Sequence, residues 1–491
     1  MKTHYRRNSF LPLAAALALL VNHATAATFT WDGSDTAYWN LAANWAGGVA
    51  PVSANTNDII ISGTANVSQM LPGAVSYTIK SLTYDATNDA DTRFTMTSTL
   101  NAAQSARNLT FNSNSGNATL TVESGSTGNK TIDRIGTINP ATIILTSSLD
   151  VIHNGSGTLT LGNAVNASVG GGGGINKSGT GTLSLPGANT YTGATTITTG
   201  TLQLNGSTHA SSTVGIGTAG ILSGSGTVNG NATLTGGGII NKSAGSIAGT
   251  LAVTGGNWNG AGTVTGAVTS SSGTFTIGNG ANLTSTAGVS AIGGALVVNG
   301  TLTGNLSTNS STTLSGTGTI TGNTTISGIH SPGNSPGIQS VSGNLGYNTG
   351  SSVTLELMAN ALGVRGTDFD GINVGGILDF IGPTTVNLAF NFAGSSVDWT
   401  DAFWDISRIG TSGWLVYDVA GSTTNFSNLS VTAANWLDGS GGSFNTSNLG
   451  NTFSLYQDGN DIYLNYNVVP EPNVAALLGG LGTLVLLRRR R

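Results

Sequence analysis

A short motif that returns about every 20 residues constrains the fold of this chain more than any other feature. Gly-Thr-Leu, followed by a polar residue and a second leucine, occupies residues 157–161, 181–185 and 200–204, and Gly220-Ile221-Leu222 follows. The starts of these four segments are separated by 24, 19 and 20 residues. A unit this short cannot bury its apolar face alone, so the period predicts a solenoid in which successive units stack.

Within each unit the apolar residues alternate with polar ones, as the pairs Leu183 and Leu185, and Leu202 and Leu204, illustrate. Alternate residues of a β-strand share one face, so we expect these leucines to point inward. Glycine and asparagine tolerate the backbone conformations of tight corners. The pattern predicts an all-β fold, a right-handed parallel β-helix, with residues 107–345 forming about 12 coils in a rod about 55 Å long.

One segment carries a family resemblance. Gly181-Thr182-Leu183 and the run Gly187-Ala188-Asn189-Thr190-Tyr191-Thr192-Gly193 resemble the autotransporter-associated β-strand repeat over residues 176–205. Weaker versions reach residue 342. The resemblance implies a β-helical surface or secreted protein.

The regions on either side of the repeats have a different composition. Residues 27–106 carry Trp31, Trp39 and Trp45, and we interpret this region as a β-rich N-terminal cap of the solenoid. The alternative is that the three tryptophans form a carbohydrate-binding platform. Residues 346–467 regain charges and aromatics, and their short strand-like runs fit either a small β-sandwich or a capped extension of the helix.

The N-terminus has the pattern of a secretory signal peptide, assigned to residues 1–26. Lys2, Arg6 and Arg7 precede an apolar stretch over residues 10–21, and Ala24-Thr25-Ala26 provides small residues for cleavage. We expect cleavage after Ala26, with Ala27 as the neighbouring choice. The chain is therefore expected to meet the export machinery.

The C-terminus, residues 468–491, combines three short signals. Pro470-Glu471-Pro472 precedes an apolar run over residues 474–487, and Arg488, Arg489, Arg490 and Arg491 follow. A helix of this length, about 21 Å, is short for a bilayer core, and the arginines should hold it on the cytoplasmic face.

These signals resemble the PEP-CTERM sorting signal of exported proteins in exopolysaccharide-producing Gram-negative bacteria, although Asn473 stands where serine or threonine is more usual. The resemblance implies a membrane protease, exosortase, as partner. It also implies a transient inner-membrane anchor formed by a short C-terminal membrane helix. The final location would be the cell surface, the outer membrane or the extracellular matrix.

Charge and cysteine content exclude several classes of function. Without residues 1–26 and the four terminal arginines, nine basic residues face 21 acidic ones, a net charge of −12. Nucleic-acid binding requires a basic surface, so no nucleic-acid partner is expected. The chain contains no cysteine, which excludes disulfides and thiolate chemistry.

The repeat region offers little material for catalysis. Residues 151–355 contain no Asp, Glu or Arg, whereas glycoside hydrolysis normally takes two carboxylates. Lys177 and Lys242 occur in matching Asn-Lys-Ser segments, which we interpret as solvated corner positions. His153, His209 and His330 are far apart in sequence and lack neighbouring acids, so we predict no metal site. Tyr191 is the remaining candidate, and we predict no catalytic or cofactor-binding residue.

Two acidic segments outside the repeats have structural interpretations. Asp401 and Asp405 are four residues apart and are expected on the first turn of a short helix, with Phe403 and Trp404 packing inward. Asp368 and Asp370 could hold calcium, but the later ligands of a calcium loop are missing, which favours a turn before a strand.

Three functions remain. The first is a non-catalytic exported surface or matrix protein, a spacer or scaffold associated with exopolysaccharide or biofilm. The second is a carbohydrate-binding adhesin that uses the terminal aromatics. The third, a polysaccharide lyase or glycosidase, has the least support, because the carboxylates are missing from the repeats.

Overall fold

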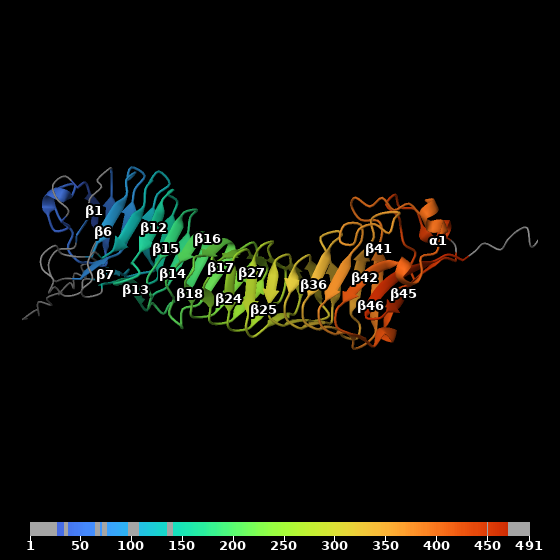
Figure 1. The fold of residues 1–491 in the computed structure, drawn as a ribbon. Helices are drawn as coiled ribbons and strands as arrows, with labels where there is room; N and C mark the ends of the chain where they lie inside the picture. The colour runs from blue at the N-terminus through green and yellow to red at the C-terminus, as the bar shows by residue number, and fades with distance from the viewer. Residues whose placement is uncertain are drawn as a thin grey trace, which may run out of the picture.

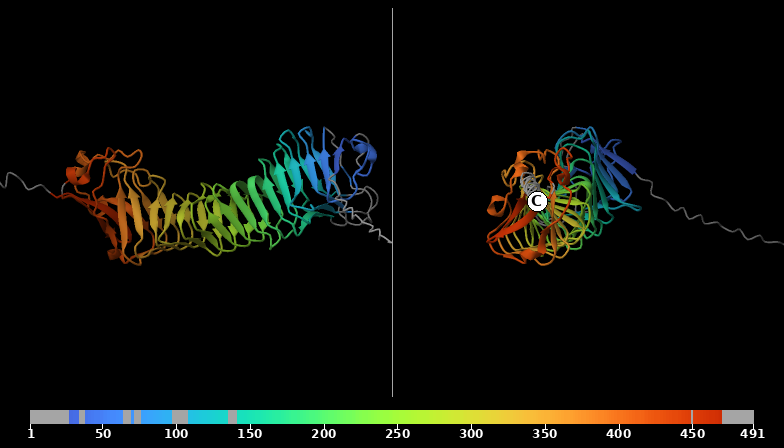
Figure 2. Two further views of the ribbon diagram at one scale, coloured as in Figure 1. Left: turned by 180° about the vertical axis from the view of Figure 1, so that it is seen from behind. Right: turned by 90° about the vertical axis from the view of Figure 1, so that its right-hand side faces the viewer.

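The computed structural model describes residues 27–33, 38–63, 69–70, 76–96, 108–134, 141–448 and 450–469. The predicted signal peptide and the predicted C-terminal membrane helix lie outside these residues. Figures 1 and 2 show an elongated, bowed rod with the N-terminal coils at one end and the C-terminal coils at the other.

Each regular coil contributes one strand to each of three parallel ladders, called here faces 1, 2 and 3. Face 1 consists of β1 (Ala27–Trp31), β2 (Asn57–Ile61), β5 (Ser81–Tyr84), β8 (Ala118–Val122), β11 (Leu149–His153), β14 (Ile175–Ser178), the first parts of β16 (Thr195–Leu204) and β17 (Val214–Ser223), β19 (Ala232–Thr235), β22 (Leu251–Thr254), β25 (Val268–Ser270), β28 (Val289–Ala291), β31 (Leu306–Thr308), β34 (Thr324–Ile326), β37 (Leu345–Tyr347), β40 (Leu378–Phe380) and β43 (Thr423–Thr424).

Faces 2 and 3 follow the same order along the chain. Face 2 consists of β3 (Gln69–Met70), β6 (Thr92–Thr95), β9 (Lys130–Asp133), β12 (Thr158–Leu161), β15 (Thr182–Leu185), the later parts of β16 and β17, β20 (Ile239–Asn241), β23 (Gly256–Trp258), β26 (Thr274–Ile277), β29 (Gly294–Val298), β32 (Thr312–Gly316), β35 (Ile329–Pro332), β38 (Ser352–Glu356), β41 (Thr384–Ala389) and β44 (Leu429–Val431). Face 3 consists of β4 (Tyr77–Ile79), β7 (Leu109–Phe111), β10 (Ala141–Leu145) and β13 (Ala167–Gly171), then β18 (Thr227–Val228), β21 (Ser246–Ile247), β24 (Ala261–Val264), β27 (Asn282–Ser285), β30 (Thr301–Thr303), β33 (Thr319–Ile320), β36 (Ile338–Val341), β39 (Gly371–Val374) and β42 (Trp414–Val419).

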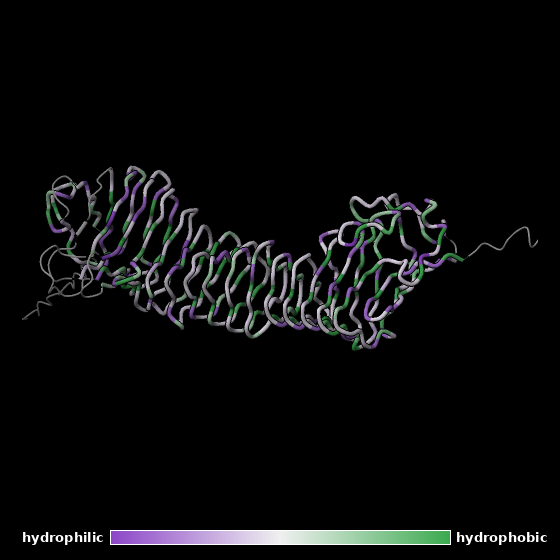
Figure 3. Tube along the Cα trace, viewed as in Figure 1, coloured by the Kyte–Doolittle hydropathy of each residue, from purple (hydrophilic) through white to green (hydrophobic). Residues whose placement is uncertain are grey.

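The interior is built from stacked apolar side chains. Leu183 lies opposite Leu202 and Leu185 opposite Leu204 on adjacent coils, and all four are fully buried. The ladder that contains Leu202 continues through Leu222, Ile240, Trp258 and Ile277. Figure 3 shows hydrophobic and hydrophilic residues interspersed along the coils, as alternation between inside and outside requires. The predicted inward register of the repeat leucines is confirmed.

Glycines occupy corners where the backbones of adjacent coils nearly touch. A Cβ atom on Gly206 would lie 1.8 Å from the carbonyl oxygen of Gly187, and one on Gly226 would lie 1.9 Å from that of Gly206. No side chain fits at these distances, so the repeat must keep glycine there for the coils to stack. This steric requirement explains part of the chain's content of 74 glycines.

The solenoid is longer than the predicted 107–345. Parallel pairing begins at β1 and continues to β44, so it crosses both predicted boundaries without a break. At about 4.8 Å per coil, the face 1 ladder alone is roughly 77 Å long. Residues 27–106 are therefore not a separate cap, because β1, β2, β5 and β6 belong to the ladders. Residues 346–467 form the capped extension, not the sandwich.

The C-terminal end is closed by an antiparallel hairpin. The strands β45 (Thr452–Asp458) and β46 (Asp461–Asn467) pair with each other, and β46 pairs antiparallel with β42. The C-terminal region also contains the short helices η2 (Ala402–Asp405), η3 (Gly410–Ser412), η4 (Phe426–Asn428) and α1 (Phe444–Ser447), while η1 (Ala42–Asn44) lies near the N-terminal end. The hairpin turns at residues 459–460, between Asp458 and Asp461. It covers the last solenoid strand of face 3.

We predict that Leu183→Asp destabilises the fold by several kcal/mol, because it buries an unpaired carboxylate within an apolar ladder. Thr182→Asp serves as the matched control, since Thr182 is half-buried and directed outward on the same strand. Circular dichroism melts should show a large loss of thermal stability for the first variant and a small change for the second. Equal losses would contradict the register.

Candidate functional site

The residues of the predicted sorting signals lie almost entirely outside the described residues. This holds for Ala26 and for Pro470, Glu471, Pro472, Arg488, Arg489, Arg490 and Arg491. Ala27 is the first residue of β1 and lies opposite Asn57. Within the described part of the chain, every helix is too short or too polar to cross a membrane.

The last described residue marks where the chain leaves the C-terminal cap. The backbone N–H of Val469 donates to Oδ1 of Asn451 at 2.8 Å, and Val469 is 54% exposed. Val469 therefore lies at the surface of the cap.

The prediction that Lys177 and Lys242 are solvated is wrong, because both side chains are fully buried, as is that of Lys130. Lys177 stands in the interior ladder of face 1, between Val151 and Ile197. Its Nζ donates to the carbonyl oxygens of Ser178 at 2.8 Å, Gly179 at 2.8 Å and Thr199 at 3.3 Å.

Lys130 repeats this arrangement on face 2, where it lies opposite Leu159. Its Nζ donates to the carbonyl oxygens of Asn88 at 3.2 Å, Ala90 at 2.6 Å and Thr127 at 2.5 Å. Burial lowers the pKa of Lys130 and of Lys177 to about 8. Both ammonium groups therefore bind backbone carbonyls at coil corners and are unavailable to a substrate.

Lys242 differs from the other two lysines. Its Nζ is buried without a hydrogen-bond partner among the described residues, and burial lowers its pKa to about 8. The matching Asn-Lys-Ser segments also fall on different faces, since Ile175 begins β14 on face 1 and Ile240 lies in β20 on face 2. The similarity of the two segments is therefore not a structural repeat.

His153 is buried between the coils that hold Lys130 and Lys177. Its Nε2 lies 2.9 Å from the carbonyl oxygen of Gly157. Its pKa is lowered to about 4, mainly by burial; the hydrogen bond to Gly157 opposes this shift, and the charges of Lys177 and Lys130 contribute to it. The imidazole is consequently neutral at physiological pH.

His330 is enclosed in a separate coil by two polar side chains. Its Nδ1 lies 2.6 Å from the hydroxyl of Tyr347, and its Nε2 lies 2.8 Å from Oε1 of Gln339. Burial also lowers the pKa of His330 to about 4. Over the described ranges, no three side chains of metal-ligating type gather in one place.

The acidic residues outside the repeats bind backbone groups. Asp401 accepts from the N–H of Phe403 at 2.7 Å and caps η2, while Trp404 is buried, as predicted for a helix start. The helix is a single 3-10 turn. Asp368 accepts from the N–H of Val364 at 2.6 Å.

The side chain of Asp370 accepts hydrogen bonds from the backbone of two other segments of the chain. It is 1% exposed; its Oδ1 accepts from the N–H of Gly337 and its Oδ2 from the N–H of Glu356, both at 2.8 Å. The pKa of Asp370 is raised to about 7, mainly by burial; the hydrogen bonds from the N–H groups of Glu356 and Gly337 oppose this shift, and the charge of Glu356 contributes to it. The bonds to the backbone account for the position of Asp370 without calcium.

The terminal aromatics do not form a platform. Trp31, Trp39 and Trp45 are at most 2% exposed and pack against one another, with ring centroids 4.8 Å apart for Trp39 and Trp45. Four large aromatic side chains near the C-terminal end are also buried: Trp399, Trp404, Trp414 and Tyr417. Burial of these rings removes the surface on which the adhesin hypothesis depended.

One half-buried tryptophan, Trp436, lies near the C-terminal end. Trp436, with Phe444 and Phe453, lines a hollow of about 180 Å³. Pockets for small molecules are usually larger, about 300–1,000 Å³. The hollow is thus small for a binding site of its own.

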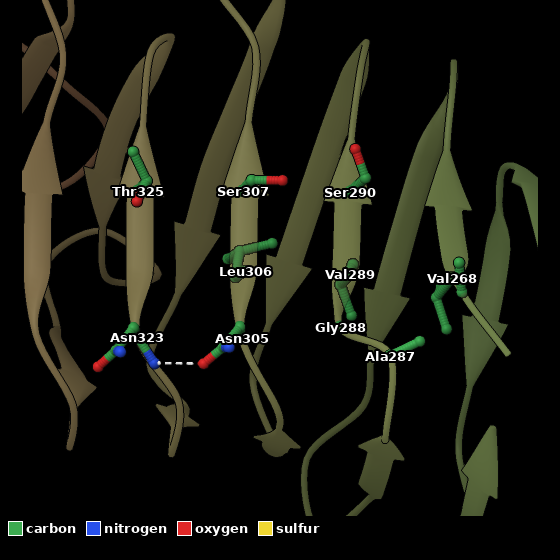
Figure 4. Close-up of a pocket in the computed structure, with 11 residues that line it drawn as sticks. Val268, Ala287, Gly288, Val289, Ser290, Asn305, Leu306, Ser307, Asn323 and Thr325 are labelled. Atoms are coloured by element: carbon green, nitrogen blue, oxygen red, sulfur yellow. Dashed lines mark hydrogen bonds between the residues drawn. The ribbon is translucent and has the colours of Figure 1, made fainter. Parts of the chain in front are cut away.

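A longer hollow runs along face 1. One part, of about 310 Å³, extends from β25 to β34, and a second, of about 290 Å³, extends from β34 to β40. Both parts are lined by Asn323 and Thr325 and therefore adjoin; together they are called here the face 1 groove. Figure 4 shows its first part, with Ser290, Ser307 and Thr325 in one row and Asn305 beside Asn323 in another.

Comparison with known families gives one match. Residues 175–204 match the passenger-associated transport repeat, a stretch that begins with β14 and ends with β16. This agrees with the predicted autotransporter-associated β-strand repeat and suggests an autotransporter-like passenger or surface protein, of a type found in Gram-negative bacteria. No curated protein matches the chain.

The buried His153 predicts a pH dependence of stability. Its pKa in the fold is about 4, compared with 6.5 for a free histidine, so its contribution is fully present above pH 6.5. Below that pH the unfolded chain binds the proton first, and the free energy of unfolding falls as the pH approaches 4. In urea unfolding, His153→Leu should reduce the difference in the free energy of unfolding between pH 7.5 and pH 4.5 by about 2 kcal/mol.

The control for this prediction is Leu159→Val, which alters the next strand without removing a titrating group. It should keep the pH dependence of the parent, to which His330 and the oppositely acting Asp370 also contribute. An unchanged dependence in His153→Leu would contradict the assignment.

Proposed function

We propose that this protein is a non-catalytic, exported surface or matrix component. In this proposal it is sorted by an exosortase-type protease and works as a spacer or scaffold in an exopolysaccharide layer. The observation that carries the proposal is the uninterrupted rod of parallel coils, whose central half has no carboxylate and no arginine. The matched repeat supports an exported surface protein, and residues 1–26 and 468–491 supply the sequence basis for export and sorting.

The rod geometry supports a spacer. Each coil is bonded to the next along three faces, so the length of the rod is set by the number of coils. A rod of this kind keeps its two ends at a fixed separation without a hinge. Val469, which precedes the predicted sorting motif in the sequence, is exposed beside the C-terminal hairpin, and this supports the proposal.

An enzyme of the polysaccharide lyase or glycosidase class is less well supported. Four of the ionisable side chains inside the solenoid, Lys130, Lys177, His153 and His330, bond to protein groups, and Lys242 is buried there as well. Asp370 and Asp401 bind backbone N–H groups. None of these groups faces a cleft in which a glycosidic bond could lie between two carboxylates.

Sorting should depend on the tripeptide and the arginine tail together. In an exosortase-positive host, Glu471→Ala should prevent trimming because it removes part of the recognised motif. Replacing Arg488, Arg489, Arg490 and Arg491 by serine should prevent it because the charge that orients the membrane segment is lost. Immunoblots of cell and medium fractions should show the untrimmed chain in both cases.

Asn473→Ser is the control for the sorting experiment, because it moves the chain towards the residue more usual in such signals. It should be trimmed and delivered like the parent. Trimming of all variants alike, or in a host without exosortase, would refute the sorting proposal.

The proposal also expects no turnover of polysaccharide. Reducing-end assays and assays for unsaturated uronides, with calcium present, should give no product with the purified chain. A turnover that disappears in Asp370→Asn or Glu356→Gln would instead establish an enzyme, because these changes remove the buried carboxylate and its neighbour.

A further inference from the structure

We infer that the face 1 groove binds a neutral polysaccharide chain that lies along the axis of the rod. This inference deepens the proposed function, on which it rests, by naming a binding surface and a ligand class. The groove extends over six strands, β25, β28, β31, β34, β37 and β40, about 24 Å at the usual strand spacing. That length suits a polymer better than a small molecule.

The first feature of the groove is a row of oriented amide donors. Asn305, Asn323 and Asn344 are exposed and occupy equivalent positions on three successive coils. The Oδ1 atom of each accepts the backbone N–H of the next coil, from Asn323 at 3.0 Å, Asn344 at 2.9 Å and Ile377 at 2.9 Å. Figure 4 shows the bond between Asn323 and Asn305.

These bonds leave the other side of each amide free. The Nδ2 atoms of Asn305, Asn323 and Asn344 have no hydrogen-bond partner within the part of the chain that the structure describes. Because each Oδ1 is held by the backbone, each NH₂ group has a fixed direction. The rim of the groove thus offers one pre-oriented donor per coil, which lowers the entropic cost of binding.

The second feature is a parallel row of hydroxyls. Ser290 lies opposite Ser307, and Ser307 opposite Thr325, with each side chain directed outward. The next position in this row is Gly346, and Ile381 covers it, since a Cβ there would lie 3.1 Å from its Cδ1. Ile377 and Ile381 are 42% and 54% exposed and give this end of the groove an apolar surface.

The charge of the groove selects a neutral ligand. Asp379 is its single ionisable lining residue, and its Oδ1 already accepts from Thr424 at 2.8 Å and Asn425 at 2.7 Å. The groove contains no cation to bind an anionic polysaccharide or a nucleic acid.

The backbone and the lining side chains disfavour a peptide. A peptide cannot add to this surface as a strand, because β28, β31, β34 and β37 are each paired on both sides. The lining also lacks the aromatic and arginine anchors that dominate protein interfaces. Amides, hydroxyls and a small apolar surface, repeated at a short interval, match a chain of neutral sugar rings.

The test measures retardation of the purified full chain in native gels that contain dextran, hydroxyethyl cellulose or alginate. We expect retardation by at least one of the two neutral polymers, unchanged between low and high salt, because the contacts carry no charge. Alginate, an anionic polymer, should give none.

Two variants locate the site. Thr325→Trp fills the groove, and Thr284→Trp places the same ring at an equally half-buried, outward position on face 3 as its control. Asn323→Asp keeps the oxygen that accepts from Asn344 but removes the donor. Thr325→Trp and Asn323→Asp should weaken retardation at least fivefold with unchanged melting temperatures, whereas Thr284→Trp should bind like the parent.

The inference is overturned if neither neutral polymer retards the chain, or if only alginate does so. Equal retardation of the parent, Thr325→Trp and Asn323→Asp would also overturn it, by placing the binding elsewhere. Trimming and surface delivery measured on the same strains separate the two proposals. If the protein is delivered normally but binds no glycan, only the inference about the face 1 groove is refuted. If it binds glycan but its delivery does not depend on exosortase, only the proposed function is refuted.

Discussion

The structure depends on the stacking of each coil against the next. A coil of about 20 residues has no core of its own, and its leucines become buried only when the neighbouring coil supplies the matching ladder. Leu202 illustrates this, since it packs between Leu183 and Leu222 of the two adjacent coils. The same stacking pairs the backbone groups along three faces, so burial and hydrogen bonding are satisfied together. Sequence changes that disturb the register therefore disturb both.

Stacking also explains why cations can lie inside the rod. The corners of a parallel coil present backbone carbonyls towards the interior, and Lys130 and Lys177 each donate to three of them. These bonds offset part of the cost of removing an ammonium group from water. Lys242, which lacks such partners among the described residues, shows the lowered pKa without the compensating bonds. The interior lysines are thus structural elements of the corners.

The fold could be predicted from the sequence because the leucine alternation and the glycine corners are local patterns. The same alternation indicates that Lys177, two residues after the buried Ile175, points into the solenoid. Its charge instead favoured the interpretation that the side chain points to solvent. The ends of the solenoid were missed because longer loops, such as those before β39 and β42, hide the period. The burial of Trp39 depends not only on the neighbouring Trp31 and Trp45 but also on Phe94, which is distant in sequence. The amide row does have a sequence signal, a Gly-Asn pair before each strand at Asn305, Asn323 and Asn344.

The neutral outer surface follows from the repeat itself. A charged residue at an outward position of a repeated unit would lie about 4.8 Å from its copy on the next coil. Two like charges at that separation repel by about 1 kcal/mol in bulk water and by about 3 kcal/mol near a protein surface. A stack of similar coils therefore favours hydroxyls and amides at these positions, as the central half of the chain shows.

Two pairs of residues on adjacent coils near the N-terminal end carry charges of opposite sign. Arg93 binds Asp133 at 2.6 Å, and Lys80 lies 3.3 Å from Asp58. Such pairs replace the repulsion between copies by attraction, but they require that neighbouring coils differ in sequence. The central coils are the most alike and carry hydroxyls and amides in rows instead. The constraint that lets the rod stack is thus the same one that gives the face 1 groove its uncharged, regularly spaced lining.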